Sequence, residues 1–527
     1  MTRFSACVAS PHRHASEAGL AVLRDGGNAL DAAIATNLVL GVVTPYHCGY
    51  GGDVFAMVWD GEAVRGYLGA GAAPRDASRE EIVRRAGAEQ MPLFGALPVT
   101  VPGAVRGWFD LLERYGSRSF GDLARHAVAR ARDGFEVGPL AEEYVARARM
   151  LYAGEEEWTR IFGDLLAGDR LVQPELAQTI ELLASDGPDA FYGGPIGQAI
   201  AAEIGMRGGL LDLDDLRAHA GEWVAPMEAA YRDLRVLELP PPTQGVTVLE
   251  ALRILDGLPQ NDRDGSAVGD PGRLAAGDEV ARVHASIEAV KMALADRDLT
   301  VTESRWMTVP ASRLLREDVI AERRARLDPS AAVAAPPGRP ARGGTAFICA
   351  ADAGGMMVSL IQSNWIGFGS GIVVSGWGIG LQNRGSAFSL DPKHPNVIAP
   401  RKRTLHTLIP GMAFRGAEPV LAFGSMGGDG QAQTHVQLLG RLVDEGLDPS
   451  AAVDAPRWVV RVNDWSVIAE DRIPAEVIEG LRTRGHRVRV TGSYDSVMGH
   501  AHVIARAPSG GYEAGSDPRA EGTALGF

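Results

Sequence analysis

The sequence of 527 residues has few of the features that mark secreted, membrane-bound or disulfide-rich proteins. Its three cysteines, Cys7, Cys48 and Cys349, have spacings that give neither a disulfide framework nor a pair of metal ligands. No apolar run is long enough to cross a bilayer, and the first residues lack the apolar stretch of a secretory signal. We therefore expect a cytoplasmic protein without a membrane partner, with its three cysteines buried as small apolar side chains.

Lysine is also scarce, and acidic residues outnumber basic ones. The formal net charge of −14 argues against nucleic acid or an anionic membrane surface as a partner. Only three of the 52 basic residues are lysines, so a lysine is barely available as a catalytic base. A hydrophobic content of 46% together with 65 glycines indicates a globular chain with a sizeable core and many turns, and there is no internal repeat.

One stretch organises the sequence, GGTAFICAAD at 343–352. A proline-rich segment at 334–342, which we expect to be a flexible linker, ends in two glycines. Thr345 then opens an apolar run typical of a buried strand, and 356–363 supplies a second strand. Thr345 can cut the peptide bond before it and become a new N-terminus whose hydroxyl is a nucleophile and whose amine is a base. On its own, the stretch is better explained by a strand that happens to begin with threonine.

The rest of the sequence predicts alternating helices and strands. A helix is expected at 15–25, and Asn28 can cap a second helix whose buried face carries Leu30, Ala33, Ile34, Asn37 and Leu38. The further expectations are a strand at 54–59, a hairpin at 226–239, helices at 246–255, 280–298 and 432–445, and a strand at 405–414.

Two features leave alternatives open. The glycine-rich loop at 44–53 is either an anion-binding nest or an ordinary loop before a strand. His284 and Glu288, four residues apart on the expected helix, are either two metal ligands or a surface or capping pair. With no third ligand nearby in the sequence, we favour the second interpretation and expect no metal and no cofactor.

Ten segments, in order and over nearly the whole chain, resemble the γ-glutamyltranspeptidase family of N-terminal-nucleophile hydrolases. They are HASEAGLAVLRDGGNALDAAIATNLVLGVVTP, VTVPGAVRGW, GGLLDLDDL with YRDLRV, PPPTQGVTVLEAL, HASIEAVKMALADR, GGTAFICAADAGG, FGSGIVVSGWGIGLQN, FGSMGGDGQAQ, AVDAPRW and GSDPRAEG. The resemblance implies an α/β fold, a four-layer αββα sandwich, and self-cleavage between Gly344 and Thr345. The products would be a large subunit, 1–344, and a small subunit, 345–527, forming one composite domain that can assemble further into a homo-oligomer.

The resemblance also implies residue roles. Thr345 matches the nucleophile, Ser363 the second hydroxyl residue that hydrogen-bonds it, and Gly427 and Gly428 the pair whose N–H groups form the oxyanion hole. The chemistry agrees, because an N-terminal amine with a pKa of about 7.7–8.0 suits a base near neutral pH.

The expected substrate pocket departs from the family pattern. The arginine that holds a γ-glutamyl carboxylate matches Ala70, and the acid that receives its amino group matches Ala387. Other polar or aromatic residues stand nearby, and we expect them to contact a different small acidic substrate: Trp365, Asn383, Arg384, His406 and Thr407. Arg384 and His406 are the expected head-group contacts; a structural salt bridge is the alternative for Arg384.

The segments SLIQSNWIGFGSG, LQNRG and TLHTLIPGM resemble the cytoplasmic transpeptidase-like branch of the family. That branch implies hydrolysis of an amide or similar acyl bond. The alternatives are C–C bond hydrolysis of a keto acid in actinobacterial biosynthesis of antibiotics with alkylated pyrroline acids, true γ-glutamyl transfer, and an unprocessed, non-catalytic homologue.

Overall fold

The computed structural model describes residues 2–258, 279–334 and 343–527. The expected linker at 334–342 lies outside the described residues except for Ala334. None of the helices within these ranges combines the length and apolar character that a bilayer crossing requires.

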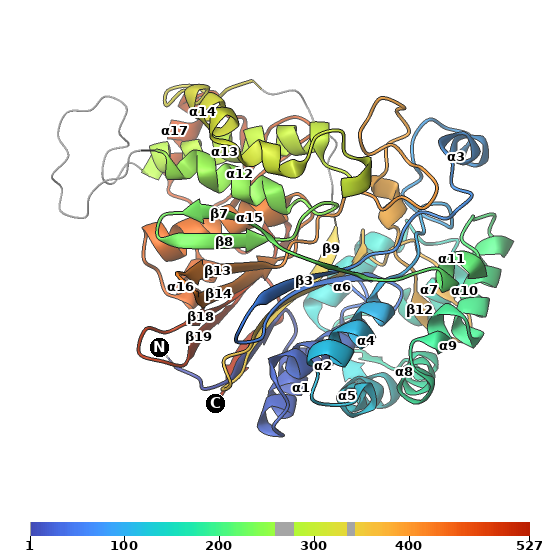
Figure 1. Cartoon of the computed structure of the whole chain (residues 1–527). Helices are drawn as coiled ribbons and strands as arrows, with labels where there is room; N and C mark the ends of the chain where they lie inside the picture. The colour runs from blue at the N-terminus through green and yellow to red at the C-terminus, as the bar shows by residue number, and fades with distance from the viewer. Residues whose placement is uncertain (1, 259–278, 335–342) are drawn as a thin grey trace.

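Two mainly antiparallel sheets form the centre of the molecule (Figure 1). The first has the strand order β20-β1-β9-β10-β2-β3-β6, and the second has the order β19-β18-β14-β13-β8-β7. The strands of the first sheet are β1 Cys7–Ser10, β2 Asp53–Trp59, β3 Val64–Gly69, β6 Glu222–Val224, β9 Gly344–Ala351, β10 Met357–Trp365 and β20 Thr523–Gly526. The strands of the second are β7 Met227–Tyr231, β8 Leu234–Glu238, β13 Gly411–Arg415, β14 Glu418–Ser425, β18 Ala501–Arg506 and β19 Tyr512–Ser516. Shorter sheets use β4 Phe135–Glu136, β5 Arg170–Leu171, β11 Val373–Val374, β12 Ile379–Gly380, β15 Trp458–Val460, β16 Val467–Glu470 and β17 Val488–Thr491.

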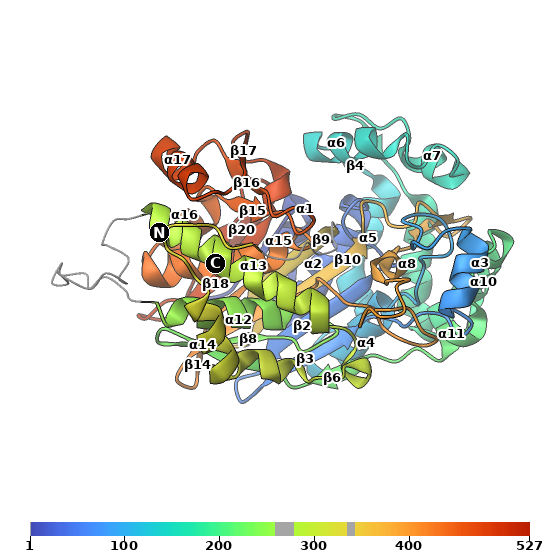
Figure 2. The same ribbon diagram turned by 90° about the horizontal axis from the view of Figure 1, so that it is seen from above.

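Helices cover the outer face of each sheet, and the two helical groups lie on opposite sides in Figures 1 and 2. The first group comprises α1 Arg13–Arg24, α2 Ala29–Val43, α4 Ala104–Tyr115, α5 Phe120–Asp133 and α8 Pro174–Asp186, with α3 Arg79–Ala86, α6 Pro139–Ala148, α7 Glu156–Phe162, α9 Asp189–Tyr192, α10 Pro195–Met206 and α11 Leu213–Arg217 nearby. The second comprises α12 Gly245–Asp256, α13 Glu279–Thr300, α14 Glu317–Ala325, α15 Gly430–Leu439, α16 Pro449–Asp454 and α17 Ala475–Thr483.

Three buried apolar clusters fill the spaces between these layers. One packs the first helices against the first sheet, and a second packs the second helices against the second sheet. The third lies between the sheets, where Phe55 and Phe347 of the first meet Met412 and Ile504 of the second. Face-to-face packing of two sheets, each with a helical layer outside, confirms the predicted four-layer αββα sandwich.

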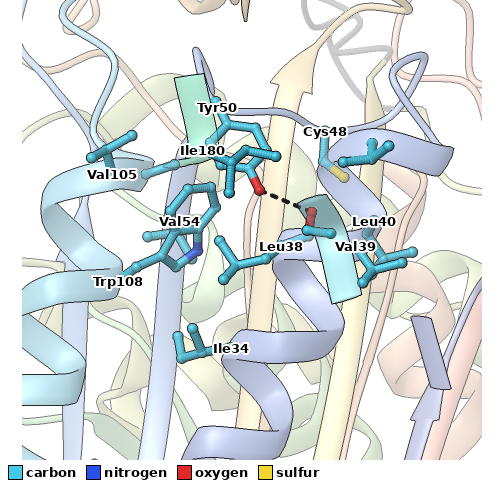
Figure 3. Packing of buried hydrophobic residues seen from close by; sticks show 14 of the residues in the cluster. Ile34, Leu38, Val39, Leu40, Cys48, Tyr50, Val54, Val105, Trp108 and Ile180 are labelled. Atoms are coloured by element: carbon cyan, nitrogen blue, oxygen red, sulfur yellow. Dashed lines mark hydrogen bonds between the residues drawn. The ribbon is translucent and has the colours of Figure 1, made fainter. Parts of the chain in front are cut away.

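Helix α2 lies at the centre of the first helical layer, against the first sheet (Figure 3). Asn28 caps it as predicted, in a capping box with Asp31. The five residues expected on its buried face are buried, and burial extends beyond them to all fifteen residues of α2. A helix that is apolar on all sides is one that is enclosed on all sides.

Two other boundaries differ from the predictions. The strand expected from residue 405 begins only at Gly411, because 405 and 406 bond elsewhere: Leu405 N–H donates to Asn396 Oδ1 and His406 N–H to Pro242 O. The helix expected to 445 ends as an α-helix at Leu439 and continues as a π-helical turn over Gly440–Asp444. The hairpin at 226–239 and the three buried, unpaired cysteines are confirmed.

Asn37 links α2 to its surroundings through two buried hydrogen bonds. Its amide donates to Gln362 Oε1 of β10 (2.8 Å) and accepts from Trp108 Nε1 of α4 (2.7 Å). Asn37→Ala leaves both partners buried and unpaired, so we expect the free energy of unfolding to fall by about 2–5 kcal/mol. Urea unfolding measures this, with the exposed Asn463→Ala as a control within about 0.5 kcal/mol of the wild type. An unchanged midpoint for Asn37→Ala would contradict the assignment.

Candidate active site

Thr345 and Ser363 face each other at the ends of two paired strands. Thr345 is the second residue of β9 and Ser363 lies near the end of β10; both are buried. The Thr345 hydroxyl lies 3.4 Å from Ser363 Oγ, and Ser363 Oγ donates to the carbonyl oxygen of Gly344 at 2.5 Å. The Trp365 N–H in turn donates to Ser363 Oγ (2.7 Å), which fixes its orientation. One hydroxyl thus lies against both the expected nucleophile and the carbonyl expected to be attacked.

Only glycine fits position 344 without movement of the backbone. A Cβ atom there would lie 2.6 Å from the carbonyl oxygen of Tyr46 and 3.2 Å from Nδ1 of His47. This close approach of the 45–47 segment explains why a glycine precedes Thr345.

The Gly427–Gly428 turn joins β14 to α15 and lies beside Thr345. Both glycines have left-handed backbones, with φ of 136° and 59°, which residues with side chains rarely adopt. Within the described chain, neither backbone N–H of this pair donates a hydrogen bond. Gln431, in the first turn of α15, donates from Nε2 to Thr345 Oγ1 at 3.4 Å, which places the turn next to the hydroxyl. Two free N–H groups at this place are suited to a developing oxyanion.

A buried network that the sequence interpretation missed holds this turn. Gln244 donates from Nε2 to the carbonyl oxygens of Gly428 and Thr407, both at 3.0 Å. Arg297 donates to Gln244 Oε1 (2.6 Å) and to Asp429 Oδ1 (2.5 Å). The residues come from positions 244, 297 and 429, and nothing in their local spacing points to a joint role.

Arg384 packs against Trp365, the last residue of β10. Its guanidinium stacks on the ring of Trp365 at 3.7 Å from the ring centroid. Trp365 has a left-handed backbone (φ 77°), which is strained for a residue of this size, and its Nε1 donates to Ser386 Oγ (2.8 Å). Both terminal nitrogens of Arg384 are buried and have no hydrogen-bond partner in the part of the chain that the structure describes. The structural salt bridge considered for Arg384 is absent from the described residues.

His406 and Thr407 lie close to Asp53 of β2, a residue that the sequence interpretation did not select. His406 Nε2 is 3.3 Å from Asp53 Oδ2, a close contact without hydrogen-bond geometry. The Thr407 hydroxyl has no partner among the described residues. Asn383 differs from these residues, because its amide is occupied: Oδ1 accepts from Ile366 N–H (3.0 Å) and Nδ2 donates to Leu93 O (2.7 Å). Asn383 therefore shapes the loop.

Burial determines the charge states here. Burial raises the pKa of Asp53 to about 7, although the positive charge of Arg384 and the N–H groups of Gly103 and Gly71 oppose this shift. Burial lowers the pKa of Arg384 to about 9, so the guanidinium remains charged at neutral pH. Burial, with Arg384 nearby, holds the pKa of His406 well below its usual range, so its ring is neutral.

The glycine-rich loop at 44–53 is a packing feature. Its carbonyl oxygens at Gly51 and Gly52 accept from Gln382 N–H (3.0 Å) and Ala104 N–H (2.9 Å). A Cβ atom at Gly52 would lie 2.6 Å from Ser363 O, so glycine lets this loop approach β10. These contacts favour the interpretation as an ordinary loop over an anion nest.

The surface or capping interpretation of His284 and Glu288 is wrong. Both are buried, and His486 completes a cluster, with its Nε2 2.7 Å from His284 Nδ1. The Lys291 ammonium lies 2.8 Å from Glu288 Oε1, and Val333 N–H donates to Glu288 Oε2 (2.9 Å). Although three ligand atoms converge, the lysine already neutralises the carboxylate, so the cluster is a closed hydrogen-bond network.

Known proteins resemble this chain over its whole length. It is 36% identical over 532 residues to the glutathione hydrolase-like YwrD proenzyme of Bacillus subtilis, with 99% of this chain and 98% of the relative covered. It is 34% identical over 537 residues to the oxamate amidohydrolase proenzyme of Klebsiella pneumoniae, with 98% of each covered. The crystal structure of a cephalosporin acylase from Bacillus halodurans superimposes with a TM-score of 0.93 at 36% identity, covering 100% of this chain and 96% of that one.

The sandwich and these relatives define the class of protein: the chain is an enzyme of the N-terminal-nucleophile hydrolase type. The model of the family described as gamma-glutamyltranspeptidase matches residues 15–527, and the chain belongs to that family.

The raised pKa of Asp53 predicts a pH dependence of stability. Between the pKa of an unfolded aspartate, near 4, and about 7, the folded chain holds a proton that the unfolded chain has lost. Stability therefore falls as pH rises through this window, at most by about 1.4 kcal/mol per pH unit. Asp53→Asn should remove this slope. Urea midpoints at pH 5, 6, 7 and 8 measure it.

Asp60→Asn is the matched control, because Asp60 is an exposed aspartate directly after β2 whose pKa is lowered, not raised. It should keep the wild-type slope. If Asp53→Asn and Asp60→Asn have the same pH profile, Asp53 is ionised throughout and the electrostatic description of the site fails.

Proposed function

We propose that the chain cuts its own Gly344–Thr345 bond and then uses Thr345 to hydrolyse an amide bond of a small substrate that bears a carboxylate. The observation that supports this most strongly is the position of Ser363 Oγ, 2.5 Å from the Gly344 carbonyl oxygen and 3.4 Å from Thr345 Oγ1. The names of the relatives, an amidohydrolase proenzyme and an acylase among them, point the same way.

In self-cleavage, Thr345 Oγ attacks the carbonyl carbon of Gly344. The Ser363 hydroxyl donates to the carbonyl oxygen, on which negative charge develops. The C–N bond breaks as the threonine nitrogen gains the proton that the Thr345 hydroxyl gives up, leaving an ester between Gly344 and Thr345 Oγ. Water hydrolyses that ester, which gives a new carboxylate at Gly344, a free amine at Thr345 and the two subunits 1–344 and 345–527.

In the processed enzyme, the Thr345 amine is the base. With an unperturbed pKa of about 7.7–8.0 it can accept the hydroxyl proton, and it belongs to the same residue as the nucleophile. The hydroxyl attacks the substrate carbonyl, the N–H groups of Gly427 and Gly428 stabilise the oxyanion, and the amine returns its proton to the leaving nitrogen. Water then releases the acid.

Arg384 is the proposed contact for the substrate carboxylate. A buried guanidinium with two unpaired nitrogens is costly to the folded protein, and a carboxylate fits both nitrogens at once. The stacked ring of Trp365 holds the guanidinium in place and leaves its edge available. The γ-glutamyl anchors expected by family resemblance are missing at Ala70 and Ala387, which disfavours the standard γ-glutamyl pocket.

Self-cleavage is tested on a denaturing gel. We expect purified wild-type protein to run as two fragments, 1–344 and 345–527, and Thr345→Ala to remain whole because it has no hydroxyl. Thr345→Ser keeps a hydroxyl and should still be cut, and the exposed Thr483→Ala should be cut as the wild type is. A wild-type protein that is active as one intact chain would rule out the mechanism.

The role of Arg384 is tested by kinetics on γ-glutamyl anilide, glutaryl amides and oxamate. Arg384→Ala should lower kcat/KM for the preferred substrate by about tenfold to a hundredfold, because one charge-assisted contact contributes about 1.5–3 kcal/mol. Exposed Arg316→Ala is the control and should leave kcat/KM unchanged. Unchanged affinity in a processed Arg384→Ala enzyme would show that the carboxylate binds elsewhere.

A further inference from the structure

Four polar side chains next to the nucleophile have atoms without partners. They come from three separate parts of the chain: Asp53 from β2, Arg384 from the short 3-10 helix Arg384–Ala387, and His406 and Thr407 from the segment before β13. Each is only 1% exposed. The unpaired atoms are Asp53 Oδ2, both terminal nitrogens of Arg384, both ring nitrogens of His406 and the Thr407 hydroxyl. Buried polar groups are nearly always paired, so such a cluster needs a reason.

Strand register places this cluster beside Thr345. Ser363 of β10 is directly opposite Asp53 of β2, and directly opposed residues in an antiparallel pair project to the same face. Ser363 also faces the Thr345 hydroxyl. On the other side, Trp365 is opposite Gly344, and its ring carries the Arg384 guanidinium. Asp53 is therefore opposite Ser363, and Arg384 stacks on Trp365, and both of these β10 residues lie next to the proposed cleavage point.

Asp53 and Arg384 influence each other but do not pair. Asp53 is opposite Ser363 in the sheet and Arg384 stacks on Trp365, two residues further along β10, so the two groups are neighbours. Yet among the described residues Arg384 has no ion pair, and Asp53 Oδ2 contacts only His406. The other oxygen, Oδ1, accepts from Gly103 N–H at 3.1 Å, which fixes the carboxyl and leaves Oδ2 for another donor. A group that carries both an acceptor and a donor can pair with these unpaired atoms of the base and the acid together.

We propose that Arg384 and Asp53 bind the two ends of one small head group, which carries a carboxylate and, within a few bonds of it, an N–H or O–H donor. This rests on the proposed function and specifies its substrate class. The carboxylate binds the two nitrogens of Arg384, and the amine, amide or hydroxyl group donates to Asp53 Oδ2. Thr407 and the neutral ring of His406 supply further contacts. A glutaryl or succinyl anilide has no donor besides its scissile amide, which is held at Thr345, and therefore leaves Asp53 unpaired.

Matched substrates test this without any mutation. The pairs γ-glutamyl anilide with glutaryl anilide, and β-aspartyl anilide with succinyl anilide, differ only in the amino group beside the carboxylate. In at least one pair, the wild-type enzyme should cleave the amino-bearing member with a kcat/KM about tenfold to a hundredfold higher, the effect of one charge-assisted hydrogen bond.

Variants then assign the preference to residues. Asp53→Asn keeps the size of the side chain and an oxygen for Gly103 but replaces the free acceptor, so it should lower kcat/KM for the amino-bearing member and abolish the preference. Arg384→Ala should weaken both members. Asp60→Asn changes an exposed aspartate directly after β2, so this variant should keep the preference.

The outcomes separate this inference from the proposed function. A wild-type protein that stays one chain overturns the proposed function. A processed enzyme that treats the members of every pair alike, prefers the members without the amino group, or cleaves none of them overturns the head-group site alone. If Asp53→Asn is not processed, the wild-type preference still decides, together with protection of wild-type Tm by glutamate compared with glutarate.

Discussion

The hydrogen bonding of β9 on both of its edges is the constraint on which the site depends. The strand is paired with β10 along nearly its whole length and with β1 through Cys349–Ala351. Under the proposed cleavage, a strand held in this way keeps the new amine close to the position of the peptide nitrogen. The pairing with β10 also brings Ser363 against the Thr345 hydroxyl. Preorganisation of this kind removes orientational cost from both reactions.

Several features of the pocket beside this strand lower the stability of the folded protein. A buried guanidinium whose terminal nitrogens have no hydrogen-bond partner among the described residues, an acid whose burial favours its neutral form, and a tryptophan with a left-handed backbone each disfavour folding. Such departures from good packing are expected at binding sites, where a ligand supplies the missing contacts. The N–H group of Gly71, next to Ala70, acts to lower the pKa of Asp53, and Arg384 lies in the same short helix as Ala387. The pocket therefore has an acid and a base of its own close to the two positions where the γ-glutamyl anchors are absent.

The family resemblance supplied the four layers and the Thr345–Ser363 pair, and local patterns supplied the elements that carry them. The apolar runs that begin at Thr345 and at Met356, divided by glycines, predict two neighbouring strands, and Asn28 predicts the start of α2. The remaining parts depend on contacts between distant segments. Asp53 is adjacent to Ser363 only through sheet register, Arg297 meets Gln244 and Asp429 only after the helices pack, and His486 contacts His284 from 202 residues further along the chain. No spacing within one window contains that information.

The central claim is that Thr345 becomes an N-terminal nucleophile. The most direct test is mass spectrometry of purified enzyme quenched during turnover of a slow amide substrate, followed by peptide mapping of any acyl adduct. The account predicts a small chain that begins at Thr345 and carries the acyl group on the Thr345 hydroxyl, with none on Ser363. An adduct on another residue, or turnover by a chain in which residues 344 and 345 are still joined, would contradict it.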